Sequence, residues 1–346
     1  MDITYLQAVV IGLLQGVTEL FPISSLGHSV LVPAWIGGSW GHLVTENSSP
    51  DAGGTPSPYL AFVVALHVAT ALALLTFFWR DWLRIVKALL VTVRARRIET
   101  PTERLAWLLV VASIPVGITG VALEHTFRTL FAKPLAASVF LTINGLILFG
   151  AERLRRRSEA GQPAVSAEPE LVGAAAGPAA PYAAPDPVSG ALAEGAASEG
   201  AAAQATVASD VPGRPGGRSL EGLGFVEAIV IGFFQSFALL AGISRSGVSM
   251  AAGLLRGLSH EDAAKFSFLL ATPVILAAGV LKLPSLAGPA GAHIHGQIVA
   301  GFLTAGVGAF LSVRFLTKYF TTRTLTPFAV YCLIAGGIST VWFAGH

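Results

Sequence analysis

Apolar residues occur along the chain in long blocks, and each block is close to the length that crosses a bilayer as a helix. About twenty predominantly apolar residues are needed for one crossing. We therefore predict six full spans, near residues 59–79, 105–123, 135–151, 266–282, 297–313 and 327–343. Hydrophobic residues make up 53% of the 346 and charged residues only 12%. This pattern predicts an all-α polytopic membrane protein.

Two further apolar segments, residues 3–36 and 225–258, are interrupted by polar residues and a turn. In the first segment Pro22 disfavours helix at Phe21, and Ser24 to Gly27 then form a turn before a second short helix. A helix, a break and a short helix predict a re-entrant hairpin. Such backbone is tolerated at membrane depth only where protein or water surrounds it.

The two predicted hairpins align without a gap at a constant offset, since 235 − 15 = 220 and 244 − 24 = 220. In this alignment seven residues of the first copy are identical to their equivalents in the second: Ala8, Gly12, Gln15, Ile23, Ser24, Gly27 and Ser29. Three predicted spans separate the copies. Because three is odd, we expect an inverted-topology repeat of two halves, residues 1–157 and 220–346, whose broken helices meet near the membrane midplane.

The copies differ at three polar positions of the first hairpin. There Glu19, Ser25 and His28 align with Leu239, Arg245 and Val248 of the second copy. Ionisable side chains at membrane depth are costly and usually mark a functional site. The sequence therefore predicts one site to which the two copies contribute side chains of different chemical types.

The connections between the spans are strongly uneven in charge. Lys and Arg crowd residues 80–104, 153–157 and 314–323, and the positive-inside rule places these on the cytoplasmic side. The site should then open to the opposite side, where residues 40–58 are expected to form a polar loop. Residues 158–219 are rich in Ala, Gly, Pro, Ser and Glu, which predicts a disordered linker.

Gln15 and Glu19 are four residues apart and share one face of a helix. A carboxylate and an amide oxygen can hold a hard divalent cation, Mg²⁺ or Ca²⁺, whose other ligands come from water and phosphate. The alternative is a Glu that only stabilises helix packing. We favour the metal role, because only Arg245 of the second copy is expected to neutralise this carboxylate.

Ser25 and His28 flank Gly27 and are candidate catalytic residues. Ser25 is a candidate nucleophile with His28 as its base or acid across one helical turn, and the alternative for Ser25 is a helix N-cap. Ser24 has the twin Ser244, which suggests a shared cap. A second intramembrane histidine, His67, is expected to bond to a neighbouring helix outside the site.

The second turn carries a pattern suited to an anion. Backbone N–H groups at a helix start favour negative charge, and Arg245 adds a fork that matches phosphate oxygens. The alternative is an Arg245 that pairs with Glu19 for packing alone. The expected phosphate-binding residues are Ser24, Gln235, Ser244, Arg245, Ser246, Gly247 and Ser249.

These motifs resemble those of the integral-membrane undecaprenyl-diphosphate phosphatases linked to bacitracin resistance. The first family motif is represented by Gln15, Glu19 and Pro22-Ile-Ser24-Ser25-Leu-Gly27-His28. The second is represented by residues 241–249, where Ala241 replaces the family's Pro and Ser249 its Thr. The resemblance covers essentially all of the chain except residues 158–219.

The resemblance implies hydrolysis of undecaprenyl diphosphate to the monophosphate, which recycles the lipid carrier for peptidoglycan in a bacterial plasma membrane. It assigns a divalent cation to Gln15 and Glu19, catalysis to Ser25 and His28, and the diphosphate to Arg245. Whether Ser25, His28 or water attacks phosphorus stays open, as does formation of a homodimer.

Other classes of function fit the pattern less well. Inverted repeats with broken helices also occur in transporters, so a transporter or scramblase of a phosphorylated lipid or anion is the main alternative. A second class of lipid phosphatase is also unsupported. That class has a Lys-rich Arg-Pro motif and a late Arg-to-His motif with an Asp, and neither motif is found in this sequence. No basic patch is interleaved with aromatic residues, which argues against a nucleic-acid partner.

Overall fold

The computed structural model describes residues 3–48, 58–131, 133–160, 217–287 and 293–345. These residues form helices and connecting turns, and no strand is assigned among them. The α-helices are α1 (Tyr5–Leu20), α2 (Ser25–Ile36), α3 (Gly38–Ser48), α4 (Pro58–Phe77), α5 (Trp79–Ala95), α6 (Pro101–Phe131), α7 (Pro134–Ala160), α8 (Phe225–Ser236), α9 (Arg245–Leu255), α10 (His260–Ala287), α11 (His295–Tyr319) and α12 (Thr326–Gly345). Two short 3₁₀ helices, η1 (Leu220–Gly222) and η2 (Phe237–Leu239), flank α8. Most of the predicted linker lies outside the described residues.

Within the described chain, five helices, α6, α7, α10, α11 and α12, are long and apolar enough by themselves to cross a membrane. A sixth span results if α4 and α5 count as one segment, which bends by 87° at the break between them. The chain is therefore a helical membrane protein with several spans, as the hydrophobic pattern predicted. The predicted count of six holds when the bent pair is counted once.

Exposed apolar side chains mark the surface that faces lipid. On α11 the large apolar residues that are more than half exposed follow one face at a spacing of four residues: Val299, Leu303, Val307, Leu311 and Phe315. The opposite face of α11 buries Ala305 and Ala309. Small residues inside and large apolar residues outside are typical of membrane helices, whose backbones pack closely against one another.

The two predicted hairpins are each a pair of short helices joined by a tight turn, α1 with α2 and α8 with α9. Neither pair contains a helix long enough to span. The first pair begins at a capping box, in which Thr4 and Gln7 satisfy each other's backbone N–H groups. The break that follows α1 and the break that follows η2 confirm the predicted interruptions, and their re-entrant orientation in the membrane stays a prediction.

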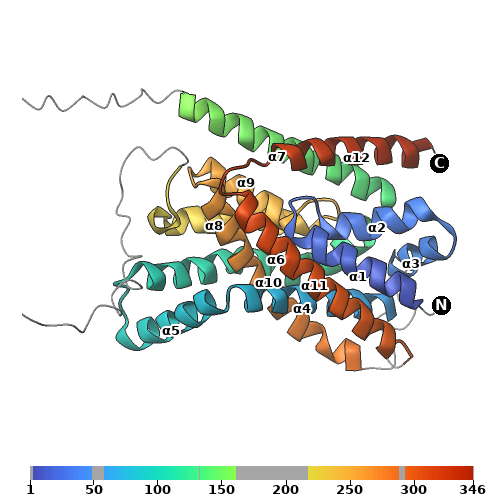
Figure 1. Cartoon of the computed structure of the whole chain (residues 1–346), viewed down its shortest axis with the longest axis horizontal. Coiled ribbons are helices and arrows are strands. Elements are labelled where there is room, and N and C mark those ends of the chain that lie inside the picture. The colour runs from blue at the N-terminus through green and yellow to red at the C-terminus, as the bar shows by residue number, and fades with distance from the viewer. Residues whose placement is uncertain (1–2, 49–57, 132, 161–216, 288–292, 346) are drawn as a thin grey trace, which may run out of the picture. The chain divides into compact units, whose positions relative to one another are not determined.

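The helices of the two halves pack reciprocally (Figure 1). Helix α1 packs along α11 of the other half, and its counterpart α8 packs along α6, the counterpart of α11. Two further pairs of counterparts meet each other directly, with α4 against α10 and α7 against α12. An exchange of partners of this kind is expected when two similar halves are related by a two-fold axis, so it supports the predicted repeat.

Helix α3 corrects one expectation. Residues 40–58 were expected to form a loop, yet Gly38–Ser48 are helical. The reason is a small apolar contact within this polar stretch, because Leu43 is buried and Trp40 packs against the same core cluster. Residues 49–57 of the expected loop lie outside the described residues.

We predict that Gly232→Ala destabilises the protein. A Cβ atom at Gly232 would lie 2.0 Å from the Ala112 carbonyl oxygen of α6, and its twin Gly12 has a matching conflict at 2.4 Å from the Gly301 carbonyl oxygen. Overpacking of this kind costs about 1–3 kcal/mol, so the unfolding temperature in detergent should fall by about 2–6 °C. Gly150→Ala in α7 is the matched control, because nothing lies within 4 Å of its added Cβ. Equal effects of the two substitutions would contradict this account of the helix contact.

Candidate active site

The first turn is shaped by Ser24. Its hydroxyl caps α2 by accepting the Gly27 N–H at 3.2 Å, and its own φ of 71° lies in the left-handed region that serine rarely adopts. Ser244 caps α9 in the same way and accepts the Gly247 N–H at 3.1 Å. The shared cap expected from the repeat is confirmed. Ser25 is not the N-cap, and its hydroxyl is therefore available to the site.

The two turns bond directly to each other. Ser24 Oγ also accepts the N–H of Gly242 at 3.2 Å, and Ser246 Oγ donates to the Phe21 carbonyl at 3.2 Å. Gly242 has a φ of 111°, which requires glycine, and an added Cβ there would lie 2.3 Å from the Ala137 carbonyl oxygen. The predicted convergence of the two broken helices is therefore present as hydrogen bonds between their turns.

Asn144 on α7 joins both turns through one amide group and was missed by the sequence analysis. Its Nδ2 donates to the Pro22 carbonyl of the first turn at 3.0 Å, and its Oδ1 accepts the Ser244 N–H of the second at 3.0 Å. The side chain is completely buried. The available signal was an amide in the middle of an otherwise apolar span, where a polar side chain needs a partner.

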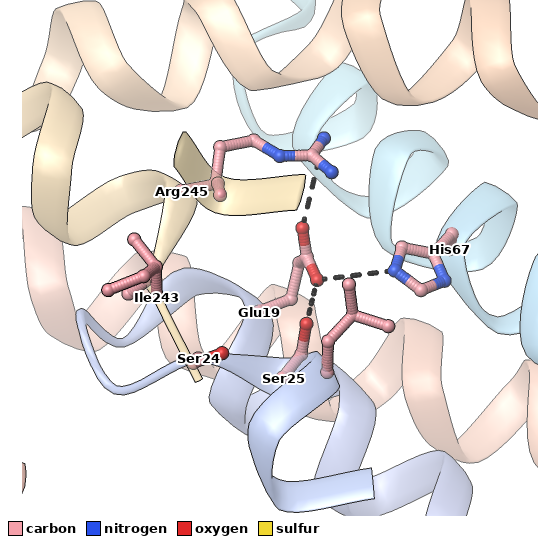
Figure 2. A pocket seen from close by; sticks show the side chains of 9 residues that line it. Glu19, Ser24, Ser25, His67, Ile243 and Arg245 are labelled. Carbon is pink, nitrogen blue, oxygen red and sulfur yellow. Dashed lines mark hydrogen bonds and ion pairs between the residues drawn. The ribbon is translucent and has the colours of Figure 1, made fainter. Parts of the chain in front are cut away.

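Glu19 is the centre of the site, with its residue only 6% exposed. Gln15 Nε2 donates to its Oε2 at 3.0 Å, and the Ser25 hydroxyl donates to the same oxygen. Arg245 Nη1 lies 4.0 Å from Oε1 on another side of the carboxylate, as Figure 2 shows. The structure thus brings together the predicted residues Gln15, Glu19, Ser25 and Arg245 from both hairpins.

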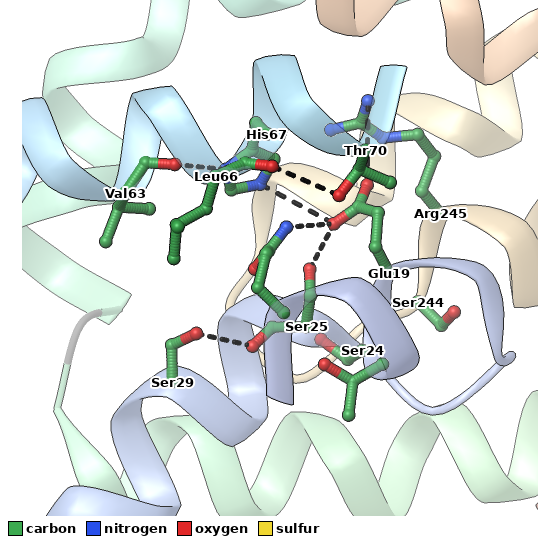
Figure 3. Close-up of polar contacts among 12 residues, drawn as sticks. Glu19, Ser24, Ser25, Ser29, Val63, Leu66, His67, Thr70, Ser244 and Arg245 are labelled. Atoms are coloured by element: carbon green, nitrogen blue, oxygen red, sulfur yellow. Dashed lines mark hydrogen bonds and ion pairs between the residues drawn. The ribbon is translucent and has the colours of Figure 1, made fainter. Parts of the chain in front are cut away.

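His67 on α4 also belongs to this cluster, so its expected place outside the site was wrong. Its Nε2 lies 3.5 Å from Glu19 Oε2. Its other ring nitrogen, Nδ1, lies 2.9 Å from the Val63 carbonyl one turn back on the same helix (Figure 3). The sequence offered only a lone histidine within a span, and the distance to Glu19 along the chain is too long for any local pattern to pair them.

His28 points elsewhere. Its Nδ1 donates to the Ser24 carbonyl at 2.7 Å, and its Nε2 accepts from the Tyr331 hydroxyl of α12 at 2.8 Å. The two rings also stack, with centroids 5.7 Å apart. The structure therefore does not pair His28 with Ser25, whose hydroxyl bonds to Glu19 instead. A catalytic role for His28 stays a prediction.

A small pocket opens at this cluster. Its polar lining comes from both turns and from α4: Glu19, Ser24, Ser25, His67, Ser244 and Arg245. Several buried polar atoms of the expected site find no hydrogen-bond partner within the described part of the chain: Gln15 Oε1, both amide atoms of Gln235, Ser249 Oγ and Arg245 Nη1. Unpaired buried donors and acceptors are expensive, so a polar ligand is expected to satisfy at least some of them.

The donors present fit a cation held only in part by protein. Among the described residues there is no group of three or more His, Cys, Asp or Glu side chains that could hold a metal ion. Glu19 offers a carboxylate and Gln15 an amide oxygen that is buried without a partner. Such a pair suits a divalent cation that takes further ligands from water and phosphate, and it does not form a closed cage.

The chain is a polytopic membrane protein with a polar site among its helices. The site combines a buried carboxylate, a hydroxyl and a guanidinium between two broken helices. Comparison with known proteins gives the family. The family model described as "Bacitracin resistance protein BacA" matches residues 8–179 and 196–338. The chain belongs to this family. The unmatched residues 180–195 fall within the predicted linker.

Relatives match over nearly their full length. A protein of Frankia alni named "Undecaprenyl-diphosphatase 2" is 62% identical over 366 residues, with 99% of each chain covered. An "Undecaprenyl-diphosphatase" of Mycolicibacterium paratuberculosis is 51% identical, with 99% of this chain and 98% of that one covered. Another from Granulibacter bethesdensis is 37% identical, with 97% and 96% covered.

We predict that Asn144→Ala destabilises the junction of the two turns. The substitution leaves the buried Ser244 N–H without its acceptor and removes the donor to Pro22, and each such loss costs about 1–3 kcal/mol. The unfolding temperature should therefore fall by about 4–12 °C. Cys332→Ala is the control, because Cys332 is equally buried beside Asn144 but contacts it only through sulfur at 3.4 Å. A loss in the control as large as in Asn144→Ala would show that packing, and not the amide bridge, stabilises this region.

Proposed function

We propose that the chain hydrolyses undecaprenyl diphosphate to undecaprenyl phosphate and inorganic phosphate at the cluster around Glu19. This reaction recycles the lipid carrier used for peptidoglycan and other envelope polymers. The observation that carries the proposal is the hydroxyl of Ser25, which donates to the buried Glu19 carboxylate in a pocket that Arg245 also lines. The names of the full-length relatives agree with it.

In the proposed first step Ser25 Oγ attacks the terminal phosphorus, and Glu19 accepts the hydroxyl proton along the hydrogen bond already present. The bond between the terminal phosphorus and the bridging oxygen breaks, and undecaprenyl phosphate leaves. Water then hydrolyses the phosphoserine, releases inorganic phosphate and restores the Ser25 hydroxyl. Direct attack by water, with Glu19 as its base, is the second route that the same geometry supports.

Transfer of a phosphoryl group depends mainly on positioning and on neutralising its charge. Arg245 suits this role, because its Nη1 has no hydrogen-bond acceptor and lies too far from Glu19 for a strong bond. The unpartnered groups of Gln235 and Ser249 offer further donors. A bound divalent cation, Mg²⁺ or Ca²⁺ held by Glu19 and Gln15, would supply additional positive charge for the phosphate oxygens.

The proposed setting is a bacterial plasma membrane, with the site open to the outer face. Contacts within the structure support one shared side for the basic connections. Lys265 at the start of α10 lies 3.7 Å from Asp81 of α5, and Arg156 near the end of α7 donates to Thr326 at the start of α12. His260 at the start of α10 also lies 2.9 Å from Glu152 near the end of α7, so the basic segments gather near the same helix ends, which the positive-inside rule assigns to the cytoplasm.

Phosphate release tests the proposed function. Purified protein in detergent should release inorganic phosphate from a C55 lipid diphosphate, and a chelator should suppress the release. Ser25→Ala and Glu19→Gln should each abolish it, because one removes the nucleophile and the other removes its base. A transporter or scramblase would bind the same lipid without releasing phosphate. Full activity of Ser25→Ala would favour attack by water.

Arg245→Lys should lower kcat by about tenfold to a thousandfold while KM changes less. A lysine keeps the charge but replaces a bidentate fork by a point charge, so it stabilises the transferring phosphoryl group less well. The unfolding temperature should change little. Arg256→Lys is the matched control, because Arg256 is exposed at the other end of α9. Wild-type kcat in Arg245→Lys would place the anion site elsewhere.

A further inference from the structure

Helix α5 departs at a sharp angle from the apolar helix that precedes it. Helix α4 has the 20 residues that one crossing of a bilayer needs, and α5 is bent by 87° from it at the break before Trp79. With α4 as the crossing helix, α5 runs close to the plane of the membrane. The break lies at the end of α4 that the charge pattern places on the cytoplasmic side.

The exposed surface of α5 consists of two parallel stripes. The large apolar residues that are at least half exposed form one stripe, in alternating steps of four and three residues: Trp79, Leu83, Val86, Leu90 and Val93. Exposed basic residues form the other stripe: Arg80, Arg84, Lys87 and Arg94. With about 3.6 residues per turn, the two stripes lie about a quarter of a turn apart. Both stripes run along nearly the whole helix.

The third face of α5 packs against protein, chiefly against α6 (Figure 1). Ile85 and Thr92 are buried on this face, and Thr92 Oγ1 accepts a hydrogen bond from Trp107 Nε1 of α6 at 2.9 Å. Asp81 is the only acidic residue of α5, and it lies 3.7 Å from Lys265 of α10. None of the four basic side chains of the stripe forms an ion pair with a residue in the described part of the chain. Their charges are therefore available to an anionic partner.

We propose that α5 is an interfacial helix whose basic stripe binds the headgroups of anionic phospholipids in the cytoplasmic leaflet. The apolar stripe rests on the acyl chains, and the basic side chains beside it extend to the lipid phosphates. Trp79 suits this boundary, and its ring lies 5.2 Å from the guanidinium of Arg80. Through its contacts with α6 and α10, a bound α5 also fixes the cytoplasmic ends of these two spans.

Two other placements fit α5 less well. If the helix stood upright in the bilayer, its basic stripe from Arg80 to Arg94 would extend over about 21 Å of depth and bring charge into the hydrocarbon. If the stripe bound an acidic protein instead, the apolar stripe beside it would stay exposed to water along its whole length. A membrane surface offers apolar and anionic partners side by side over that length.

The depth of α5 is measured on full-length protein in nanodiscs of phosphatidylcholine and phosphatidylglycerol. Leu83→Cys and Leu90→Cys each carry a fluorescent label, in a Cys332→Ala background that removes the single native cysteine. Lipids with nitroxides at two acyl-chain depths quench the label and report its depth. An upright helix would place the two labels about 10 Å apart in depth, whereas we expect equal depths. A difference of more than about half that value would overturn the proposal.

Headgroup selectivity is measured with the label at Leu90→Cys and with nitroxide lipids that differ only in their headgroups. One basic residue near a bilayer surface favours anionic lipid by about fivefold. Phosphatidylglycerol should therefore be enriched over phosphatidylcholine around α5 by about fivefold or more. Arg84→Gln combined with Lys87→Gln should lower this enrichment by about fivefold or more, while Arg84→Lys, which keeps the charge, should preserve it.

Arg153→Gln combined with Arg157→Gln is the matched control. Both residues are exposed near the end of α7, so this variant removes the same charge on the same predicted side of the membrane and away from α5. The enrichment around α5 should stay at the wild-type value. All of these side chains are exposed, so each variant should keep the wild-type unfolding temperature. Equal enrichment of the two lipids in the wild type would overturn the proposal, as would an equal loss in the control.

Discussion

The hydrogen bonds that join the two turns are the constraint on which the site depends. A helix that breaks at membrane depth leaves backbone N–H and C=O groups without partners, and lipid offers none. Here the partners come from the other break. Ser24 accepts a hydrogen bond from the Gly242 N–H. The amide of Asn144 donates to the Pro22 carbonyl and accepts from the Ser244 N–H. Each broken helix is therefore stable only when the other is in place.

This mutual dependence explains why the site combines chemistry from distant parts of the chain. The caps at Ser24 and Ser244 are retained in both copies because both turns need them. The positions that point between the turns are free to differ, and they carry Glu19 and Ser25 from one copy and Arg245 from the other. A buried carboxylate needs compensating partners. Glu19 finds them on α1, α2, α9 and α4, so its partners also bring these four helices together around the pocket.

The separation of the two histidines has a similar basis. His28 lies on the face of α2 that meets Tyr331 of α12, while His67 reaches Glu19 from α4. Sequence proximity favoured His28 as the partner of Ser25. The observed packing instead gives Ser25 the carboxylate of Glu19 as its acceptor, which makes Glu19 the base in the proposed reaction.

The sequence by itself determined the helical membrane class, the two broken helices, their repeat and most of the polar residues around Glu19. These follow from local physics, because hydrophobic length, a proline break and a serine cap act within a few residues. The tertiary structure alone decided the roles of Asn144 and His67, the contact of His28 with Tyr331, and the short helix α3. The first three depend on side chains that meet across 48 to 303 positions of the chain, and α3 depends on packing of Trp40 and Leu43 against a core cluster. Such contacts exist only after the helices have packed, since no spacing along the sequence encodes which faces will meet.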